Sequence, residues 1–207
     1  MRTVLFIVVS VAALFGVRPA MAIEEPSYTV VRSPDGYELR NYPTYCVAQT
    51  EVTETQSEAG NAGFRILAKY IFGGNTTNSS IAMTAPVVQA PSETIAMTAP
   101  VTQEPGSGPG RYVVAFTMPS KYTLETLPKP NDDRVRLREV GERIVAVRVY
   151  GGGWSLARYE KELAALRTAL ARDALVPIGE PQWARYNAPF SLPFMRRNEI
   201  WLQVDRH

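Results

Sequence analysis

The sequence predicts an α+β domain in which two helices pack against a curved, mostly antiparallel sheet. Two segments, one after Thr55 and one after Ser155, carry apolar residues at the three- and four-residue spacing of a helix. Most other apolar segments alternate with polar residues at the period of a strand. The order of strands, a helix and a pair of strands occurs twice, and this repetition indicates a duplicated β-α-β-β unit.

The first 22 residues of the 207-residue chain have the pattern of an export signal. Arg2 precedes an apolar run from Val4 to Phe15, and Ala20-Met21-Ala22 is the small-x-small pattern that signal peptidase cleaves. We expect a mature protein of residues 23–207 in a single domain, periplasmic or secreted, with no membrane span left after cleavage. A retained anchor is the alternative, although the run is shorter than the about 20 apolar residues of a spanning helix.

Charge and cysteine content limit the classes of partner. The leader contains two of the 22 basic residues, Arg2 and Arg18, so the mature chain is formally neutral against its 20 acidic residues. A nucleic-acid partner would require a basic surface, and we expect no such partner. Cys46 is the single cysteine, so no internal disulfide can form. Its apolar neighbours predict a buried thiol on a strand, with a reactive thiol as the alternative.

The first half of the mature chain contains three predicted strands followed by a helix. The strands cover 28–31, 37–42 and 44–52. Thr55-Gln56-Ser57-Glu58 fits a capping box, which predicts that the helix begins there, and Gly73-Gly74-Asn75 ends it. Gly60 and Gly63 leave bare backbone on the first turns of this helix, where another surface or a flat ligand could approach closely.

The heptapeptide Ile-Ala-Met-Thr-Ala-Pro-Val occurs at 81–87 and again at 95–101. Its apolar residues alternate, so each copy is predicted to be a strand with one buried face. The two copies are predicted to pair as an antiparallel hairpin about Pro91, with Met83 and Met97 each opposite an alanine. Flexible methionines suit an adaptable ligand surface. Ordinary core packing without a ligand is the alternative.

The second half of the chain repeats the pattern of the first. Its predicted strands cover 111–118, 135–140, 143–150, 182–187 and 199–204. Ser155 is the predicted N-cap of the clearest helix in the chain, and Pro177 ends the helical region. The apolar stripe of this helix consists of Leu156, Tyr159, Leu163, Leu166 and Leu170. We expect the stripe to fill the core, because burying each large apolar side chain is worth roughly 1.5–3 kcal/mol.

The sequence contains no recognisable catalytic constellation. Its single histidine, His207, excludes a Ser-His-Asp arrangement and a zinc site with several histidines. Gly151-Gly152-Gly153 lacks the Lys-Ser/Thr of a phosphate-binding loop. Glu160 and Glu162 are interpreted as part of a solvated helix face. These residues favour a binding domain over an enzyme.

Several motifs together resemble the SOUL haem-binding family. They are the repeated heptapeptide, Tyr37-Glu38-Leu39-Arg40-Asn41-Tyr42-Pro43, Lys69-Tyr70 with Gly73-Gly74-Asn75, Ala184-Arg185-Tyr186-Asn187-Ala188-Pro189-Phe190 and Arg196-Arg197-Asn198-Glu199-Ile200-Trp201. The resemblance covers most of residues 28–204. It implies a distorted antiparallel β-barrel flanked by two helices and built as a pseudo-two-fold repeat. It also implies a small-molecule tetrapyrrole ligand, typically haem.

The resemblance implies a ligand site on the exposed face of the first helix. Porphyrin would be held there by apolar contacts, with Arg or Lys at its propionates. The site residues that it implies are Phe64, Arg65, Leu67, Ala68 and Ile71, with Lys69 near the rim. Met83 and Met97 of the heptapeptides are further candidates. The alternative is that Phe64, Leu67 and Ile71 only fill the core.

One position departs from the family pattern. Some animal members have a histidine, regarded as an iron ligand, where this sequence has Asn41, whose amide is a poor ligand for haem iron. The remaining candidates are Cys46, Met83, Met97 or a tyrosine, so we expect weak axial ligation or none. The implied fold also resembles gyrase-inhibitor-like modules that bind varied small amphipathic molecules. Binding or turnover of another such molecule is therefore the alternative function.

Overall fold

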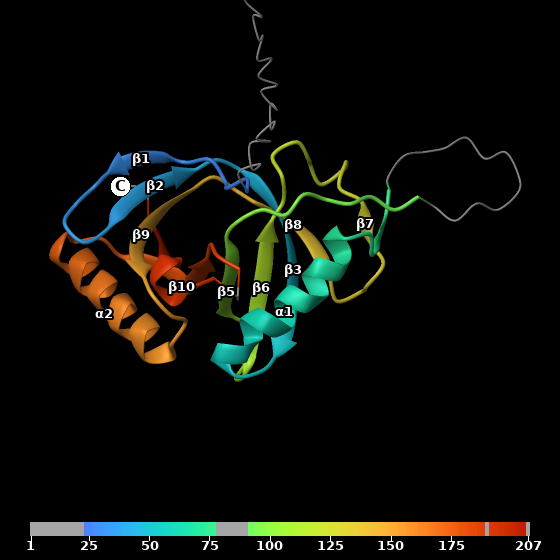
Figure 1. The fold of residues 1–207 in the computed structure, drawn as a ribbon. Coiled ribbons are helices and arrows are strands. Elements are labelled where there is room, and N and C mark those ends of the chain that lie inside the picture. Colours follow the sequence, from blue (N-terminus) through green and yellow to red (C-terminus); the bar gives the residue numbers. More distant parts are fainter. Residues whose placement is uncertain (1–22, 78–90, 189–190, 206–207) are drawn as a thin grey trace, which may run out of the picture.

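The computed structural model describes residues 23–77, 91–188 and 191–205. These residues form a curled half-barrel sheet of nine antiparallel strands flanked by two helices, which confirms the predicted fold class (Figure 1). The helices are α1 (Gln56–Ile71) and α2 (Leu156–Arg172). The strands of the large sheet are β1 (Thr29–Arg32), β2 (Glu38–Tyr42), β3 (Tyr45–Thr53), β5 (Val101–Pro105), β6 (Arg111–Thr117), β8 (Arg136–Val140), β9 (Arg143–Gly151), β10 (Pro177–Arg185) and β11 (Arg197–Val204). The short strands β4 (Asn75–Thr76) and β7 (Lys129–Pro130) form a separate pair, and η1 (Pro193–Met195) is a single 3-10 turn.

The strand order β1-β2-β9-β11-β10-β5-β6-β3-β8 confirms the duplicated unit. Apart from the short β4, the segments β3-α1-β5-β6 and β9-α2-β10-β11 contain the same elements in the same order. The two units join where β5 pairs with β10, a boundary that we call the seam. β2 pairs with β9 of the second unit, and β8 pairs with β3 of the first, so these outer strands connect the two units into one domain.

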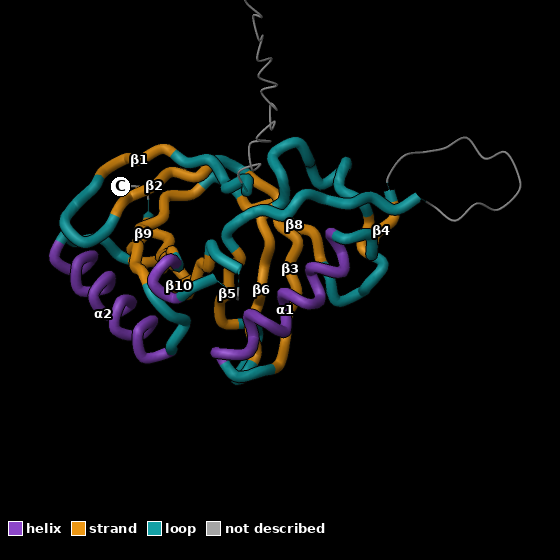
Figure 2. Tube along the Cα trace, viewed as in Figure 1, coloured by secondary structure: helices purple, strands orange, loops and turns teal. Residues whose placement is uncertain are grey.

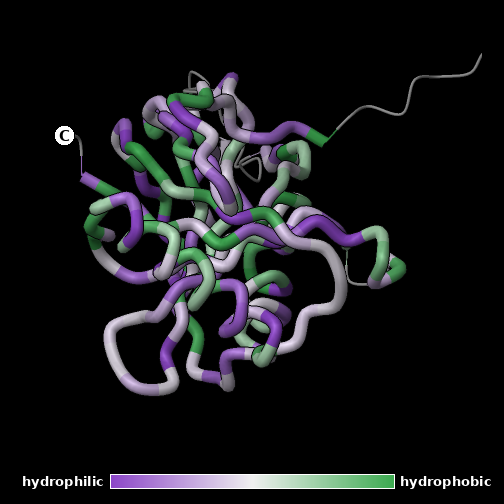
Figure 3. The backbone as a smooth tube through the Cα atoms, turned by 90° about the vertical axis from the view of Figure 1, so that its left-hand side faces the viewer, coloured by the Kyte–Doolittle hydropathy of each residue, from purple (hydrophilic) through white to green (hydrophobic). Residues whose placement is uncertain are grey.

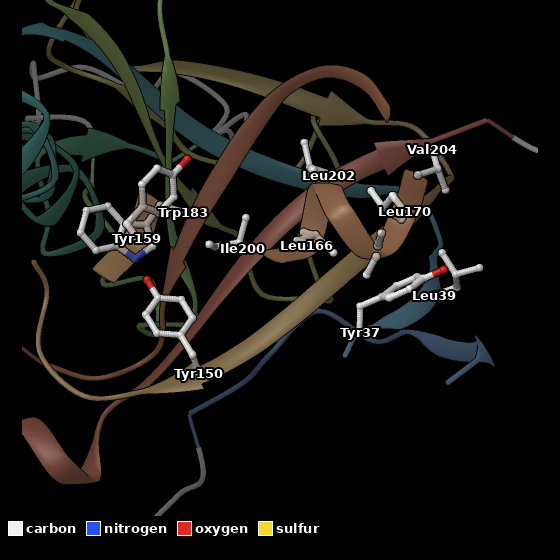
Figure 4. Close-up of a cluster of buried hydrophobic side chains, with 12 residues drawn as sticks. Tyr37, Leu39, Tyr150, Tyr159, Leu166, Leu170, Trp183, Ile200, Leu202 and Val204 are labelled. Carbon is white, nitrogen blue, oxygen red and sulfur yellow. The ribbon is translucent and has the colours of Figure 1, made fainter. Parts of the chain in front are cut away.

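Both helices lie on the same face of the sheet (Figures 1 and 2). α1 packs on β3, β5 and β6, and α2 packs on β9, β10 and β11. Hydrophobic and hydrophilic segments are interspersed along the chain (Figure 3), and successive side chains of each strand point to opposite faces of the sheet, so alternate residues of a strand face the helices. Tyr159, Leu166 and Leu170 of the predicted α2 stripe belong to the cluster in Figure 4. Leu163 is partly buried against this cluster, and Leu156 is 38% exposed. Among the described residues, neither helix has the length and apolar composition to cross a membrane.

Gly63 allows α1 to pack closely on the sheet. A Cβ atom at this position would lie 2.6 Å from the Cγ2 atom of Val114 on β6. Any larger residue would therefore push the helix away from the strand. The bare backbone that the sequence shows at this turn is covered by the protein's own sheet.

The helix ends agree with the predictions, with one correction. Thr55 precedes α1 as its N-cap, but its hydroxyl lies 3.1 Å from the hydroxyl of Ser57 and makes no capping hydrogen bond, so the predicted capping box does not form. At the other end the Gly74 N–H donates to the carbonyl of Lys69 at 2.8 Å, which confirms the predicted stop. Ser155 caps α2 as predicted.

The predicted strand over the second heptapeptide is wrong. Residues 95–100 form an extended loop, and β5 begins at Val101, because the proline that precedes Val101 has no N–H to donate to a ladder. Thr98 in this loop forms an isolated bridge with Glu24 instead. The first heptapeptide, including Met83, lies outside the described residues, as do the predicted export signal and His207.

The face of the sheet opposite the helices encloses the carboxylate of Glu199, on β11. This fully buried group accepts hydrogen bonds from Arg40, Arg197, Tyr186 and Trp201 at 2.7–3.1 Å. Burial alone would raise the pKa of Glu199, but the Arg40 charge and the hydrogen bonds outweigh burial and hold the pKa below its ordinary value. The network gives the Arg-Arg-Asn-Glu-Ile-Trp motif a structural role in the sheet.

Substitution Glu199→Gln is expected to lower the free energy of unfolding at pH 7 by about 3–5 kcal/mol, because two arginines lose their shared carboxylate. The folded-state pKa of Glu199 is below the unfolded value of about 4.3. The contribution of Glu199 is therefore present above that pH and is lost as the pH falls through the folded pKa. Urea unfolding at pH 7 and pH 3 should show a smaller loss on acidification in the variant than in the wild type. Equal stability of the two proteins at pH 7 would contradict this account.

Candidate binding site

An apolar pocket of about 380 Å³ opens on the helix-bearing face, between α1 and the segment that leads into α2. Its walls come from α1, the loop before β5, the segment before α2 and the end of β10 with the loop after it. The lining residues are Ile23, Gly60, Asn61, Phe64, Met97, Thr98, Ala99, Val101, Trp154, Arg185, Tyr186, Asn187 and Ala188. Because β5 and β10 both contribute, the pocket lies at one end of the seam and uses both duplicated units.

Arg185 is the one charged residue among those that line the pocket. It follows Trp183 by two residues on β10, so both side chains lie on the helix-bearing face. Arg185 is 7% exposed, and its guanidinium carbon lies 4.0 Å from the ring centre of Trp183 and 5.0 Å from that of Trp154. A Cβ atom at Gly60 would lie 3.0 Å from the same guanidinium carbon. The missing side chain at Gly60 therefore provides the space that the guanidinium occupies.

Hydrogen bonds fix Trp154 as a wall of the pocket. Its indole N–H donates to the side-chain oxygen of Asn198, on β11, at 2.8 Å. Asn198 is fully buried and donates in turn to the carbonyl of Gly152 at 3.1 Å. The guanidinium of Arg196 lies 4.4 Å from the ring centre of Trp154. The orientation of the indole is therefore fixed by its hydrogen bond to β11, although Trp154 itself lies in a loop.

The guanidinium of Arg185 has few polar partners. Its Nη2 atom donates to the side-chain oxygen of Gln103 at 3.3 Å, and its Nε atom has no hydrogen-bond partner among the described residues. Within the same part of the chain, no carboxylate forms an ion pair with it. Burial lowers the pKa of Arg185 to about 10, so the group still carries its charge at neutral pH. The pocket thus combines apolar walls with a buried cation that has no directly paired carboxylate among the described residues.

Two of the predicted site residues, Phe64 and Met97, line the pocket. The ring of Phe64 also packs 5.3 Å from that of Phe116, so this residue serves both the site and the core. Arg65 and Lys69 are exposed, and Ala68 is half-buried, but none of the three lines the pocket.

The expectation that Leu67 and Ile71 lie on the exposed face of α1 is wrong. Their exposed fractions are 0% and 1%, and both belong to the apolar cluster between α1 and the sheet. Packing on β3 and β6 leaves these two side chains no free surface for a ligand, as the core-filling alternative states. Met83 lies outside the described residues.

Neither Trp154 nor Arg185 is among the site residues predicted from the sequence. Trp183 and Arg185 lie two positions apart on a predicted strand, which places both side chains on one face, and Trp154 is an apolar residue directly after three glycines. Neither pattern shows that Trp154 and Arg185 meet. Their contact depends on how the segment before α2 lies across the end of β10.

Of the predicted iron ligands, Met97 lies in the pocket and is 39% exposed. Tyr186 also lines the pocket, but its hydroxyl donates to Glu199 at 2.7 Å. Cys46 is buried, as predicted, and lines a different cavity of about 420 Å³. The Asn41 amide donates to a carboxylate oxygen of Glu142 at 2.9 Å. Across residues 23–77, 91–188 and 191–205, no group of three or more His, Cys, Asp or Glu side chains is arranged to hold a metal ion.

Comparison with known sequences identifies relatives over most of the chain. The family model of the SOUL heme-binding protein matches residues 23–94 and 89–203. Human heme-binding protein 2 is 31% identical over 192 residues, which cover 88% of this chain and 87% of the relative. Heme-binding protein 1 of Xenopus laevis is 27% identical over 168 residues, with 80% and 82% of the two chains covered.

Comparison with solved structures supports the fold. The C-terminal domain of EcmrR superposes with a TM-score of 0.57 at 9% identity, over 83% of this chain and 99% of that domain. A hydrolase from Listeria innocua superposes with a TM-score of 0.54 at 12% identity, over 82% of this chain and 91% of that protein. At such low identities the similarity concerns the fold alone.

The thiol of Cys46 is expected to react slowly in the native protein. Burial, with a smaller contribution from the charge of Glu139, raises the pKa of this thiol and so lowers its thiolate fraction. Its rate with Ellman's reagent at pH 8 should be at least about tenfold lower in the native protein than in urea-unfolded protein, because the reagent needs an exposed thiolate. Similar rates in the two states would show that the thiol is accessible and could serve as a ligand.

Proposed function

This chain belongs to the SOUL haem-binding family, and from that membership we propose that it binds haem or a related tetrapyrrole in the apolar pocket beside α1. The observation that carries the proposal is the pocket itself, an apolar cavity of about 380 Å³ with one buried cation in its wall. Small-molecule sites commonly enclose about 300–1,000 Å³ and combine apolar walls with a few polar groups. An apolar ring system with carboxylate substituents has the matching chemistry.

The chemical character of the pocket residues matches that of a porphyrin. Phe64, Met97 and Trp154 would contact the apolar macrocycle, and Arg185 is the cation available to a propionate. The pocket opens to the surface, so part of the ring would remain in contact with solvent. Bound haem would supply an iron atom, and this iron would be held in place through the ring and its substituents.

We propose that axial ligation of the iron is weak or absent. Among the described candidates, Met97 is a sulfur-containing residue that lines the pocket and is partly exposed. The hydroxyl of Tyr186 is engaged by Glu199, and Cys46 lines another cavity. A single thioether without a second strong ligand supports binding through the macrocycle more than binding through the metal.

We propose a binding role for the pocket and no catalytic one. Among the described residues, its lining includes no Asp, Glu, His, Cys or Lys, which are the side chains that most often transfer protons or act as nucleophiles. Sequestration or carriage of the ligand needs apolar contact and charge complementarity, and the pocket provides groups for both.

We further propose that residues 1–22 are removed on export and that the mature protein acts in the periplasm or outside the cell. The basic, apolar and small-x-small order of these residues supports this step. Ile23, the first residue after the predicted cleavage point, lines the pocket, so cleavage there would retain every described pocket residue.

Binding of another small amphipathic molecule is the second candidate. The observation in its favour is that the pocket's lining is mostly apolar and contains no feature specific to iron. Hemin binding no tighter than to an unrelated apolar protein, together with saturable binding of another component of a cell extract, would favour this candidate over haem.

Titration of the mature protein with hemin is expected to give a saturable Soret band. Phe64→Asp and Met97→Asp should each weaken binding at least about tenfold, because a carboxylate on the apolar wall must be desolvated and repels the propionates. Phe72→Asp is a matched control, since Phe72 is 60% exposed just after α1 and does not line the pocket. Equal losses in Phe64→Asp and Phe72→Asp would contradict the proposed location. Met97→Leu, which keeps the size and apolarity of the side chain, should leave the Soret maximum unchanged if axial ligation is weak.

Expression of the full chain with its leader is expected to yield a protein in the periplasmic fraction or the medium. N-terminal sequencing should then begin at Ile23, because signal peptidase cuts after the small-x-small sequence. A cell-associated product that retains Met1 or Arg2 would contradict the export proposal and leave the binding proposal untouched.

A further inference from the structure

Among the described residues no carboxylate forms an ion pair with Arg185, and the charge of Glu58, on α1, acts on it only from beyond ion-pair distance. A buried charge is costly unless it is paired, and natural interiors seldom leave one without a partner. The other deeply buried arginine of the sheet, Arg40, donates to the carboxylates of Glu199 at 3.1 Å and Glu38 at 2.8 Å. Arg185 is bonded within the described residues to the neutral amide of Gln103 alone. The two arginines are similarly buried, but among the described residues Arg40 alone of the two has a directly paired carboxylate.

Several elements together hold this unpaired cation at the pocket. The guanidinium lies near the ring centres of Trp154 and Trp183, and α1 leaves room for it at Gly60. Asn198 fixes Trp154 from β11. Stacking on indole rings lessens the cost of burying the charge but supplies no negative charge. The described part of the structure therefore holds a positive group at an apolar cavity without a directly paired carboxylate, although Glu58 attracts it from a longer distance.

We infer that Arg185 is the counter-ion for a carboxylate of the bound ligand, and that the pocket consequently selects anionic ligands over neutral ones of the same shape. This inference rests on the proposed function, and for haem the carboxylate is a propionate. A guanidinium suits this role because its planar set of N–H groups matches the geometry of a carboxylate. The apolar surroundings strengthen the attraction, because little water remains to screen it.

The pair of hemin and hemin dimethyl ester tests the inference on the unaltered protein. The two share the macrocycle and the iron, and the ester lacks the negative charges. The mature protein should bind hemin at least about tenfold more tightly than the ester, the difference expected for one charge-assisted hydrogen bond. Quenching of tryptophan fluorescence, with absorbance as a second readout, measures both dissociation constants.

Substitution Arg185→Met removes the charge and keeps an apolar stem of similar length, so the preference for hemin over the ester should fall to about twofold or less. Arg185→Lys should retain most of the preference. Arg167→Met is the matched control, because Arg167 is exposed on α2 and does not line the pocket. Circular dichroism checks that each variant is folded. If Arg185→Met does not fold, the comparison of hemin with its ester on the wild type decides.

The outcomes separate this inference from the proposed function. Equal binding of hemin and the ester by the wild type would overturn the inference and leave tetrapyrrole binding standing. A preference that persists in Arg185→Met would also overturn it, since another group would then select the carboxylate. No saturable binding of either compound would overturn the proposed function, and the inference with it.

A carboxylate on an apolar body also occurs in fatty acids, so laurate and dodecanol form a second pair of probes. Displacement of hemin by laurate and not by dodecanol would support carboxylate selection and extend it to chain lipids. Displacement by neither, with the preference for hemin over its ester intact, would assign the carboxylate to the porphyrin.

Discussion

The guanidinium of Arg185 fits against the backbone of α1 because residue 60 is a glycine. One turn later Gly63 lets the same helix pack against Val114, so two glycines set the distance between α1 and the sheet. The seam between β5 and β10 runs beneath this contact. The position of α1 therefore decides both the packing of the first unit and the shape of the pocket beside it. A side chain at either glycine would alter the fold and the site together.

β11 contributes buried polar side chains to both faces of the sheet. Asn198 points to the helix-bearing face and holds Trp154 at the pocket, whereas the next residue, Glu199, points to the opposite face and binds Arg40 and Arg197. Alternation along one strand thus lets a short motif support the site and the interior at once. Both buried residues are fixed by several hydrogen bonds, so the strand that carries them presents a rigid base to the pocket.

Local periodicity was sufficient to predict the helices and most strands of the large sheet, because each covers enough residues for one face to stand out. Apart from the capping box at Thr55, the errors concern contacts between distant segments. Alternation in the second heptapeptide indicated a strand, yet Thr98 pairs with Glu24, far away in the sequence. The phase of α1 showed an apolar stripe that includes Leu67, but only packing on β3 and β6 decides that this stripe is covered. No local pattern in the sequence predicts the contact between Trp154 and Arg185, because it depends on how the segment before α2 lies relative to the end of β10.

We propose that a tetrapyrrole occupies the pocket between α1 and Trp154. Paramagnetic broadening of backbone amide signals by hemin, with gallium protoporphyrin as the diamagnetic reference, locates the iron directly. Binding in this pocket should selectively remove the signals of Gly60, Met97 and Ala188, whereas those of Cys46 and Glu139 in the other cavity should be retained. Broadening centred on Cys46 and Glu139, or spread evenly over the protein, would contradict it.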